Sequence, residues 1–446
     1  MDEKLKEIES FIFDRASKTK LPGISITVMK DKDVIFEKAY GFSDVEGNKP
    51  ATSDTVYGIG SISKSFACLA LLKLHEMNLL SIDDPVDKYI DFPLKDVTIR
   101  NLMSHTSGIP SLGYAESLIR TFIGIKTPWL PIGTIDDLIS YMNGVEEFKL
   151  LNPGERFLYL NEGYEVIEKI VEVVSGKSYK EFLREEIMKP AGLNCYFLDE
   201  IEKLENGAIP YIKKDGRFVR TLIPGGPIFA AGGVACSTRE LAKYGQFLIE
   251  KAKGVLNEST FSKMEKSHIK VPYEYPYADG FYGLGLFIMK NFLGRTVYEH
   301  GGSVLVYTAH LMYSREDRVS IAVLTNASGY PMKNIAHYTF ASLVLNEKEL
   351  PFVKKEKLYS EIKGVYSLYK EAMTANVRPY SDFVKIAFDA DDEQEIILVP
   401  EKVHDDHLAF YTMVNGAKLP VEFFKENGKW YFIYERYIFR KNKITE

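Results

Sequence analysis

The stretch that decides this fold is Gly58-Ile59-Gly60-Ser61-Ile62-Ser63-Lys64-Ser65, early in a chain of 446 residues. Ser61 and Lys64 lie three residues apart, so on a helix with about 3.6 residues per turn their side chains share one face. The residues that follow are apolar around most of that helix: Phe66, Leu69, Leu71, Leu72, Leu74 and Met77. The pattern predicts a buried helix that begins near Ser61 and carries a lysine in its first turn.

A lysine in that position can activate the serine. A serine hydroxyl is inert near neutral pH until a neighbouring group accepts its proton. Burial and the positive end of the helix dipole both disfavour an ammonium, so we expect Lys64 to act as that base in its neutral form. The same Ser-x-x-Lys spacing recurs at Ser17, Ser267, Ser360 and Ser367, so spacing alone also fits a surface serine beside a solvated lysine.

Composition and charge exclude several classes of protein. The chain is 46% hydrophobic and 26% charged, which predicts a globular protein long enough for two domains or more. Its net charge of -6 and the lack of a basic cluster argue against a nucleic-acid partner. The charged residues 1–7 are unlike a signal peptide and no run reaches the ~20 apolar residues of a membrane span, so we expect a cytoplasmic protein without a membrane partner. Glutamine occurs only at Gln246 and Gln394 while lysine and glutamate abound, a bias typical of hyperthermophiles.

The cysteines and histidines indicate neither a disulfide framework nor a metal site. Cys68, Cys195 and Cys236 are few, odd in number and widely spaced, which predicts neither a disulfide framework nor a zinc motif. The run His404-Asp405-Asp406-His407 has side chains that ligate metals, but its expected place in a turn favours a solvated loop. We therefore expect no metal.

Strand and helix patterns predict a helical region inserted into a β-sheet. Strand-like runs form an early hairpin and return near the end of the segment, at 23–29, 34–40, 283–289, 296–300, 307–313 and 319–325. Between them, helical periodicity is clearest at 164–174 and 237–248. An α+β fold follows, with a mainly antiparallel sheet built from both ends of the segment and helices packed beside it.

The composition changes at residues 346–358, where a charged stretch with a proline indicates a domain boundary. We therefore divide the chain into domains 1–348 and 349–446. The second consists of short strand-like runs, and Asn415-Gly416 and Asn427-Gly428 are strong hairpin signals. About seven or eight such runs predict a small antiparallel β-barrel.

Two further motifs can complete a site around Ser61. Tyr159-Leu160-Asn161 offers a phenol that can exchange protons with a lysine, first as base and then as acid toward the leaving group. In His300-Gly301-Gly302-Ser303 the glycines let a substrate backbone approach, and the Ser303 N–H can join that of Ser61 in an oxyanion hole. Each motif alone also fits a structural role, because Tyr141-Met142-Asn143 repeats the first and a tight strand turn accounts for the second.

Taken in order, these motifs resemble the serine β-lactamase-like superfamily, in particular the penicillin-binding-protein-related branch with class C β-lactamases, D-aminopeptidases and carboxylesterases. The resemblance covers about residues 15–345 and rests also on Thr98–Pro110, Asn152–Gly163, Ala230-Ala231-Gly232-Gly233 and Gly301–Asn326. It implies a sheet domain and an all-helical region with the site between them, and an acyl-enzyme mechanism that needs no metal or cofactor. Within Thr98–Pro110 we expect His105 to be a hydrogen-bonded structural residue.

The resemblance also assigns roles to the motif residues. It implies that Ser61 is the nucleophile, Lys64 its activating partner and Tyr159 a proton shuttle. Asn161 would bind a substrate amide, and Gly301, Gly302 and Ser303 would line the substrate strand and oxyanion hole.

One departure from the motifs of the family narrows the range of expected activities. Many relatives carry Lys-Thr-Gly or Lys-Ser-Gly where this chain has His300-Gly301-Gly302, and a mostly neutral histidine is a poor anchor for a substrate carboxylate. This disfavours β-lactamase and carboxypeptidase activity and resembles the D-aminopeptidase type. His300 can itself be a third proton-handling member of the site, and the sequence does not choose between it and Tyr159.

The layout further resembles archaeal serine peptidases with a lipocalin-like C-terminal domain that form a closed, self-compartmentalising homo-oligomer, and we consider an octamer. The implied substrates are short peptides, including ones with D-residues. The alternatives are a carboxylesterase using the same site and, more distantly, a non-catalytic ligand-binding protein. The barrel can bind a small apolar ligand. It can instead form a contact between subunits or a wall that restricts substrate entry, and we favour this second interpretation.

Overall fold

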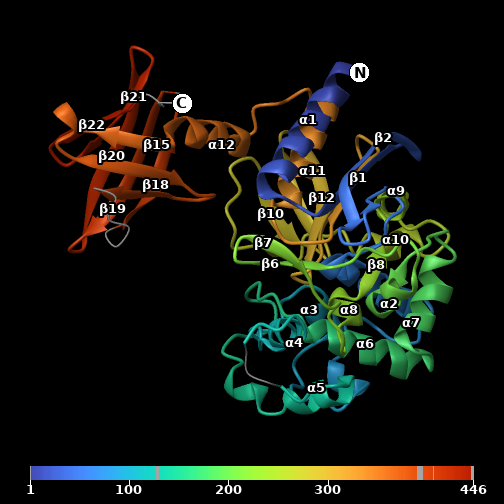
Figure 1. Ribbon diagram of the computed structural model, residues 1–446. Coiled ribbons are helices and arrows are strands. Elements are labelled where there is room, and N and C mark those ends of the chain that lie inside the picture. The colour runs from blue at the N-terminus through green and yellow to red at the C-terminus, as the bar shows by residue number, and fades with distance from the viewer. Residues whose placement is uncertain (1, 127–129, 389–394, 405, 443–446) are drawn as a thin grey trace. The chain divides into compact units, whose positions relative to one another are not determined.

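The computed structural model describes residues 2–126, 130–388, 395–404 and 406–442 (Figure 1). The chain forms two compact units, Met1–Asn346 and Glu347–Glu446, which are described separately. No helix among the described residues combines the length and apolarity needed to cross a membrane.

The first unit is built on a nine-stranded antiparallel sheet. Its strands, from edge to edge, are β3 (Lys49–Pro50), β2 (Asp33–Asp44), β1 (Gly23–Lys30), β14 (Val319–Thr325), β13 (Thr308–Ser314), β12 (Arg295–Ser303), β11 (Phe287–Phe292), β10 (Asp279–Tyr282) and β9 (Ile269–Lys270). β1 pairs with β14, with Ile24 opposite Thr325, so strands from the two ends of the unit meet at the centre. This confirms the predicted sheet and its helical insertion.

One predicted strand is wrong in its bounds. The run 283–289 contains a turn, because the Gly283 N–H donates to the Leu286 carbonyl at 2.8 Å and Gly285 has a φ of +71°. β10 ends before this turn and β11 starts after it. The apolar residues of the turn face the core, which gave it the composition of a strand.

Helices cover both faces of the sheet: α1 (Asp2–Thr19), α9 (Thr238–Ile249) and α11 (Met332–Phe340), which continues as a π-helical turn, Ala341–Leu345 (Figure 1). α9 lies so close to the sheet that a Cβ on Gly245 would be 2.6 Å from Ser320. α11 packs on the opposite face, where its His337 meets Glu299 of β12. Ser237 caps α9 by accepting the Glu240 N–H.

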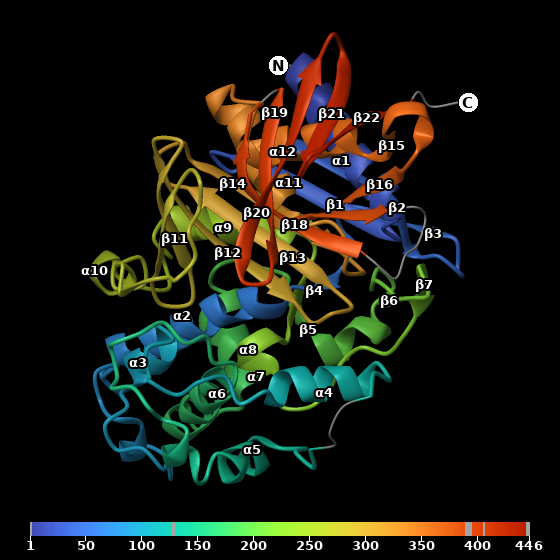
Figure 2. The same cartoon turned by 90° about the vertical axis from the view of Figure 1, so that its left-hand side faces the viewer.

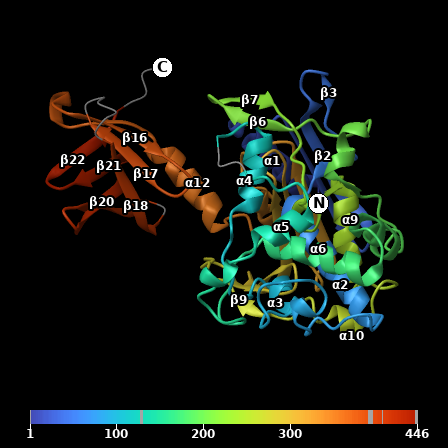
Figure 3. The same cartoon turned by 90° about the horizontal axis from the view of Figure 1, so that it is seen from below.

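The helical region lies beside the sheet, with α2 and α6 next to each other (Figures 2 and 3). Its helices are α2 (Ser63–Glu76), α3 (Ile99–Met103), α4 (Tyr114–Phe122), α5 (Ile135–Tyr141), α6 (Glu162–Ser175), α7 (Tyr179–Phe182), α8 (Phe229–Gly232) and α10 (Glu258–Phe261). Short turns join them: Gly60–Ile62, Val86–Lys88, Val145–Glu147, Leu183–Met188 and Leu198–Lys203. α2 is buried on every side from Ser63 to Leu72, as its apolar sequence predicts.

Two small sheets complete the first unit: β4 (Tyr57–Gly58), β8 (Val234–Cys236) and β5 (Tyr196–Phe197) form one, and β6 (Tyr211–Lys214) and β7 (Arg217–Arg220) the other. β8 lies between β4 and β5, so it braces the strand that leads directly into Ser61.

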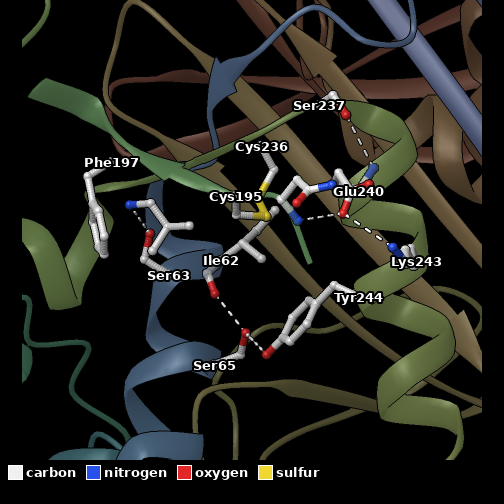
Figure 4. Close-up of a disulfide and its surroundings, with 12 residues drawn as sticks. Ile62, Ser63, Ser65, Cys195, Phe197, Cys236, Ser237, Glu240, Lys243 and Tyr244 are labelled. Carbon is white, nitrogen blue, oxygen red and sulfur yellow. Dashed lines mark hydrogen bonds and ion pairs between the residues drawn. A yellow bond between two sulfur atoms is a disulfide. The ribbon is translucent and has the colours of Figure 1, made fainter. Parts of the chain in front are cut away.

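A disulfide joins Cys195 to Cys236 in the first of these sheets, and here the prediction from cysteine spacing is wrong. The cysteines are 41 residues apart in sequence, but pairing of β5 with β8 brings their Cα atoms to 4.7 Å. Figure 4 shows the Cys195–Cys236 bond, which lies between α2, near Ser63, and α9, which carries Tyr244. Sequence spacing did not reveal it because strand pairing, not chain distance, brings the two sulfurs together.

The second unit is a closed eight-stranded antiparallel barrel preceded by α12 (Pro351–Ile362), which confirms the predicted barrel. Its strands are β15 (Gly364–Ser367), β16 (Thr374–Pro379), β17 (Val384–Phe388), β18 (Glu395–Val403), β19 (His407–Val414), β20 (Ala417–Glu426), β21 (Lys429–Tyr434) and β22 (Tyr437–Lys441), with a short helical turn at Tyr369–Glu371. Asn415-Gly416 and Asn427-Gly428 are the predicted hairpin turns, with positive φ at all four residues.

Aromatic side chains fill the interior of this barrel. Buried rings come from strands on all sides: Tyr366, Phe410, Phe423, Phe432 and Phe439. An interior filled by side chains is typical of a small eight-stranded barrel. Of the predicted loop His404–His407, Asp405 lies outside the described residues, and the His404 N–H donates to the His407 carbonyl at 2.9 Å.

Candidate active site

Ser61 lies in the turn Gly60–Ile62 that runs directly into α2, and Lys64 lies in the first turn of that helix. The Lys64 Nζ is fully buried and lies 3.0 Å from the Ser61 Oγ, 2.8 Å from the Asn161 Oδ1 and 2.7 Å from the Ala231 carbonyl oxygen. An ammonium has three N–H donors, and these three acceptors use all of them. The neutral amine keeps two donors and turns its lone pair toward Ser61.

The electrostatics favour that neutral form. Burial lowers the pKa of Lys64 to about 7, against opposing attraction from the carboxylates of Glu165, Glu116 and Glu162. At this pKa a large share of Lys64 is unprotonated near neutral pH, as the base of a serine nucleophile must be.

Tyr159 is next to the pair. Its ring centroid lies 4.9 Å from the Lys64 Nζ. Burial raises the pKa of Tyr159, and a hydrogen bond with the Ser61 side chain opposes that rise. The phenol is therefore protonated at neutral pH and lies within reach of the nucleophile.

His105 holds the segment that carries Tyr159. Its Nδ1 accepts the Leu160 N–H at 3.0 Å and its carbonyl accepts the Leu158 N–H at 2.8 Å, so it bonds the chain on both sides of the tyrosine. His105 has a φ of +56° and is buried, which agrees with its predicted role as a hydrogen-bonded structural residue.

His300 has different partners. Its Nδ1 lies 2.6 Å from the Gly301 carbonyl oxygen and its Nε2 lies 3.1 Å from the Tyr282 hydroxyl. Burial lowers the pKa of His300 to about 3, so the imidazole is neutral. Within the described residues no hydrogen bond joins it to Ser61 or Lys64. The contacts of the nucleophile therefore favour Tyr159 over His300 as its proton partner.

The opposite face of β12 carries a buried ion cluster. The Glu299 carboxylate lies 2.8 Å from Lys333, 2.6 Å from His337 and 3.2 Å from His310. Burial opposes ionisation of Glu299, but Lys333 and His337 outweigh it and hold the pKa of this carboxyl well below its usual range. Glutamate and histidine can ligate metals, yet here Lys333 already balances the carboxylate. The cluster ties α11 to the strand of His300.

Two glycines explain how β12 meets the nucleophile. A Cβ on Gly302 would lie 1.8 Å from the Ile59 carbonyl oxygen and 3.1 Å from the Ser61 nitrogen, and a Cβ on Gly60 would lie 2.4 Å from the Ser303 nitrogen. The backbones of the two segments are thus in direct contact, which brings together the Ser61 and Ser303 nitrogens that are predicted to form the oxyanion hole. Gly301, by contrast, is exposed, and a Cβ on it would lie 3.6 Å from the His310 Nδ1, on the face of β12 that carries Glu299 and away from Ser61.

A cavity of about 220 Å³ opens at Ser61. Asn161 and Ser303 line it together with two residues that sequence reasoning missed, Glu116 and Arg120 of α4. The Glu116 carboxylate accepts a hydrogen bond from the Asn161 Nδ2 at 3.2 Å. Glu116 and Arg120 are four residues apart, a spacing typical of an ordinary exposed pair on a helix. Only the packing of α4 shows that both line the cavity. A larger hollow of about 700 Å³ beside Cys195 is lined by neither Ser61 nor Lys64.

A serine beside a buried lysine, placed between strand β12 of an antiparallel sheet and a helical region, defines the β-lactamase type of serine hydrolase. Residues 8–346 match the family model described as Beta-lactamase, and the chain belongs to that family. Residues 346–440 match the model of the Pab87 octamerisation domain.

Two solved structures are similar to this chain. The octameric penicillin-binding protein homologue from Pyrococcus abyssi is 41% identical, with a TM-score of 0.93 over 98% of this chain and 99% of that one. A D-amino acid amidase from Ochrobactrum anthropi, complexed with L-phenylalanine amide, is 19% identical, with a TM-score of 0.63 over 77% of this chain and 99% of that one. The second likeness shows the fold alone.

Two curated relatives are more distant. Protein flp of Staphylococcus aureus is 25% identical over 400 residues, which are 86% of this chain and 73% of that protein. Penicillin-binding protein 4* of Bacillus subtilis is 27% identical over 192 residues, 43% of this chain, and the match spans only 41% of the Bacillus protein.

Proposed function

We propose that the protein is a serine peptidase that hydrolyses short peptides through an acyl-enzyme on Ser61. The observation that carries this proposal is the 3.0 Å contact between the Ser61 Oγ and a Lys64 Nζ whose pKa burial lowers to about 7. Such a lysine activates the serine without a metal or cofactor. The expectation that none is needed stays a prediction.

The chemistry follows from the geometry. The Ser61 Oγ attacks the substrate carbonyl carbon while its proton passes to Lys64, and the resulting oxyanion accepts hydrogen bonds from the Ser61 and Ser303 N–H groups. Tyr159 donates a proton to the leaving amine as the C–N bond breaks and is reprotonated from Lys64. Water then attacks the ester, releases the acid and restores Ser61.

The cavity supports a peptide substrate. Asn161 offers an amide at the wall, and Glu116 and Arg120 offer one charge of each sign. A neutral His300 gives no anchor for the carboxylate that a β-lactamase or carboxypeptidase recognises. The fold shared with proteins described as D-amino acid amidase and D-stereospecific amidohydrolase supports testing D-residues first.

The test is mass-spectrometric analysis of products from a pool of peptides with L- and D-residues. Wild type and Ser17→Ala should cleave the pool, because Ser17 is an exposed serine with the same Ser-x-x-Lys spacing. Ser61→Ala should leave it intact. Hydrolysis of esters but not of peptides by the folded wild type would instead make the protein a carboxylesterase. If it bound peptides but hydrolysed neither class, it would be the non-catalytic ligand-binding protein.

We also propose that the chain forms a homo-octamer through its barrel unit, in line with its match to the Pab87 octamerisation domain. An unexported peptidase gains from enclosing its sites, and the predicted cytoplasmic location fits this need. Light scattering on the full chain should give eight times the chain mass of 50.8 kDa. A monomer mass would rule the assembly out.

A further inference from the structure

Leu305 has a backbone conformation that a leucine rarely adopts. Its φ is +64°, and among the described residues only one other leucine, Leu293, has a positive φ. A bulky residue in this region is an outlier because its Cβ crowds the backbone, and glycine or asparagine is the usual residue there. Strained residues persist only where the surrounding structure holds them, and they cluster at functional sites.

The surroundings of Leu305 hold it in this conformation. The residue lies in the turn between β12 and β13. Its N–H donates to the Ser303 Oγ at 3.2 Å, and its carbonyl oxygen accepts the Ser328 hydroxyl at 2.6 Å. Its neighbours Val304 and Val306 are buried. The backbone is therefore fixed at Leu305, and so is the point from which its side chain extends.

Leu305 belongs to the wall of the active site. It lines the cavity that opens at Ser61, two residues after the Ser303 N–H that is predicted to bind the oxyanion. It is 36% exposed, although both neighbours in sequence are buried. A partly exposed apolar residue beside a nucleophile can be covered by the substrate, and removing its surface from water favours binding.

The helical region contributes apolar residues to the same cavity. Ile119 of α4 and Ile228, which precedes α8, both line it. Ligand pockets are lined mainly by apolar side chains, with a few polar groups that orient the ligand. Here Asn161 and the charged residues of α4 are the polar groups, and Leu305 with the two isoleucines forms the apolar part.

We propose that Leu305 is a specificity-determining residue that contacts an apolar side chain of the substrate next to the bond that is cleaved. This inference deepens the proposed peptidase function and rests on it. The substrates are then short peptides with an apolar residue beside the scissile bond. The strained backbone at Leu305 places the contact before the substrate arrives, so little ordering is needed on binding.

The test compares peptides that differ only in one residue next to the scissile bond, leucine in one and serine in the other, with each side of the bond varied in turn. Wild type should have the higher kcat/KM for a leucine peptide. Leu305→Asn should reduce the ratio of the two kcat/KM values about tenfold, because asparagine tolerates the same φ but is polar.

Leu293→Asn is the matched control and should leave this ratio unchanged. Leu293 also has a positive φ, +48°, but it lies in the turn between β11 and β12, outside the residues that line the cavity. If Leu305→Asn lowered kcat/KM by the same factor for both peptides, their ratio would stay the same and the inference would be wrong.

Thermal unfolding separates this role from a purely structural one. Leu305→Gly and Leu305→Asn both remove the strain, so each should keep the Tm close to that of wild type. A lower Tm together with an unchanged ratio of kcat/KM values would show that the leucine is present for packing, and would overturn the inference.

Failure of the peptidase proposal has a different signature. If folded wild type cleaves none of the peptides, the comparison uses the rates at which hexyl and methyl fluorophosphonates label Ser61, since these reagents need only an activated serine. A lower hexyl-to-methyl ratio in Leu305→Asn, but not in Leu293→Asn, would support the apolar contact while refuting the peptidase. An unchanged ratio would refute the contact as well.

Discussion

At the scale of single residues, the site depends on the protonation of Lys64. Because burial lowers its pKa to about 7, the neutral base is present above that pH and is lost below it. We expect kcat/KM for a cleaved peptide to rise roughly tenfold per pH unit up to about 7 and then to level off. A pH–rate profile measures this, with circular dichroism to show that the fold persists. A flat profile down to pH 5 would exclude Lys64 as the titrating base.

Local spacing made this pair predictable, since Ser61 and Lys64 lie on one turn of one helix. Glu116 and the Ala231 carbonyl were beyond the reach of sequence reasoning, because they come from distant segments and belong to unremarkable residue types. The same holds for Glu165 and Glu168, whose pattern on α6 looks like the charged face of a surface helix. Only packing against α8 shows that this face is buried.

At the scale of elements, β12 and the turn that carries Ser61 are in direct backbone contact. A methyl group at Gly302 would overlap the Ile59 carbonyl oxygen, so Gly302→Ala must push the strand away from the nucleophile. We expect a fall of at least about 100-fold in kcat/KM, because displacement by about 1 Å costs that much in a preorganised site. Gly133→Ala is the control, since the nearest atom to its added Cβ lies at 3.8 Å. Full activity in Gly302→Ala would refute this coupling.

The Cys195–Cys236 disulfide stabilises the small sheet behind α2. Closing a loop of 41 residues lowers the entropy of the unfolded chain, so replacing both cysteines by alanine should reduce the free energy of unfolding by about 3–4 kcal/mol. Denaturant titration measures the change. A reductant should destabilise wild type by a similar amount and leave the double variant unaffected. If it affected both equally, the bond would not be the cause.

At the scale of the whole molecule, the scarcity of glutamine and the abundance of lysine and glutamate predict a protein of a hyperthermophile. Ion pairs between segments far apart in sequence fit this, such as Arg239 with Glu37 and Arg318 with Asp31. Ion-pair networks stabilise more at high temperature because the cost of desolvating charges falls. We expect a Tm above about 90 °C by calorimetry. A midpoint in the mesophilic range would refute the hypothesis.

Both architectures were predictable because they depend on repeating signals along the chain. Asn-Gly turns and alternating strands indicate a barrel, and strands at both ends of a helical stretch indicate the catalytic sheet. Strand ends were less predictable, as the turn at Gly283 shows, because buried turn residues resemble strand residues in composition. The cysteine pairing was missed since it depends on which strands are neighbours.

The setting of His300 limits how this enzyme can diverge. Its imidazole lies among three aromatic rings, with centroids 5.2 Å from Phe287, 5.9 Å from Tyr282 and 6.3 Å from Tyr159. A lysine introduced there would have to place its ammonium in this enclosure rather than at the substrate strand. One codon change therefore does not turn this chain into an enzyme that selects carboxylate-bearing substrates. The aromatic side chains around His300 would have to change as well.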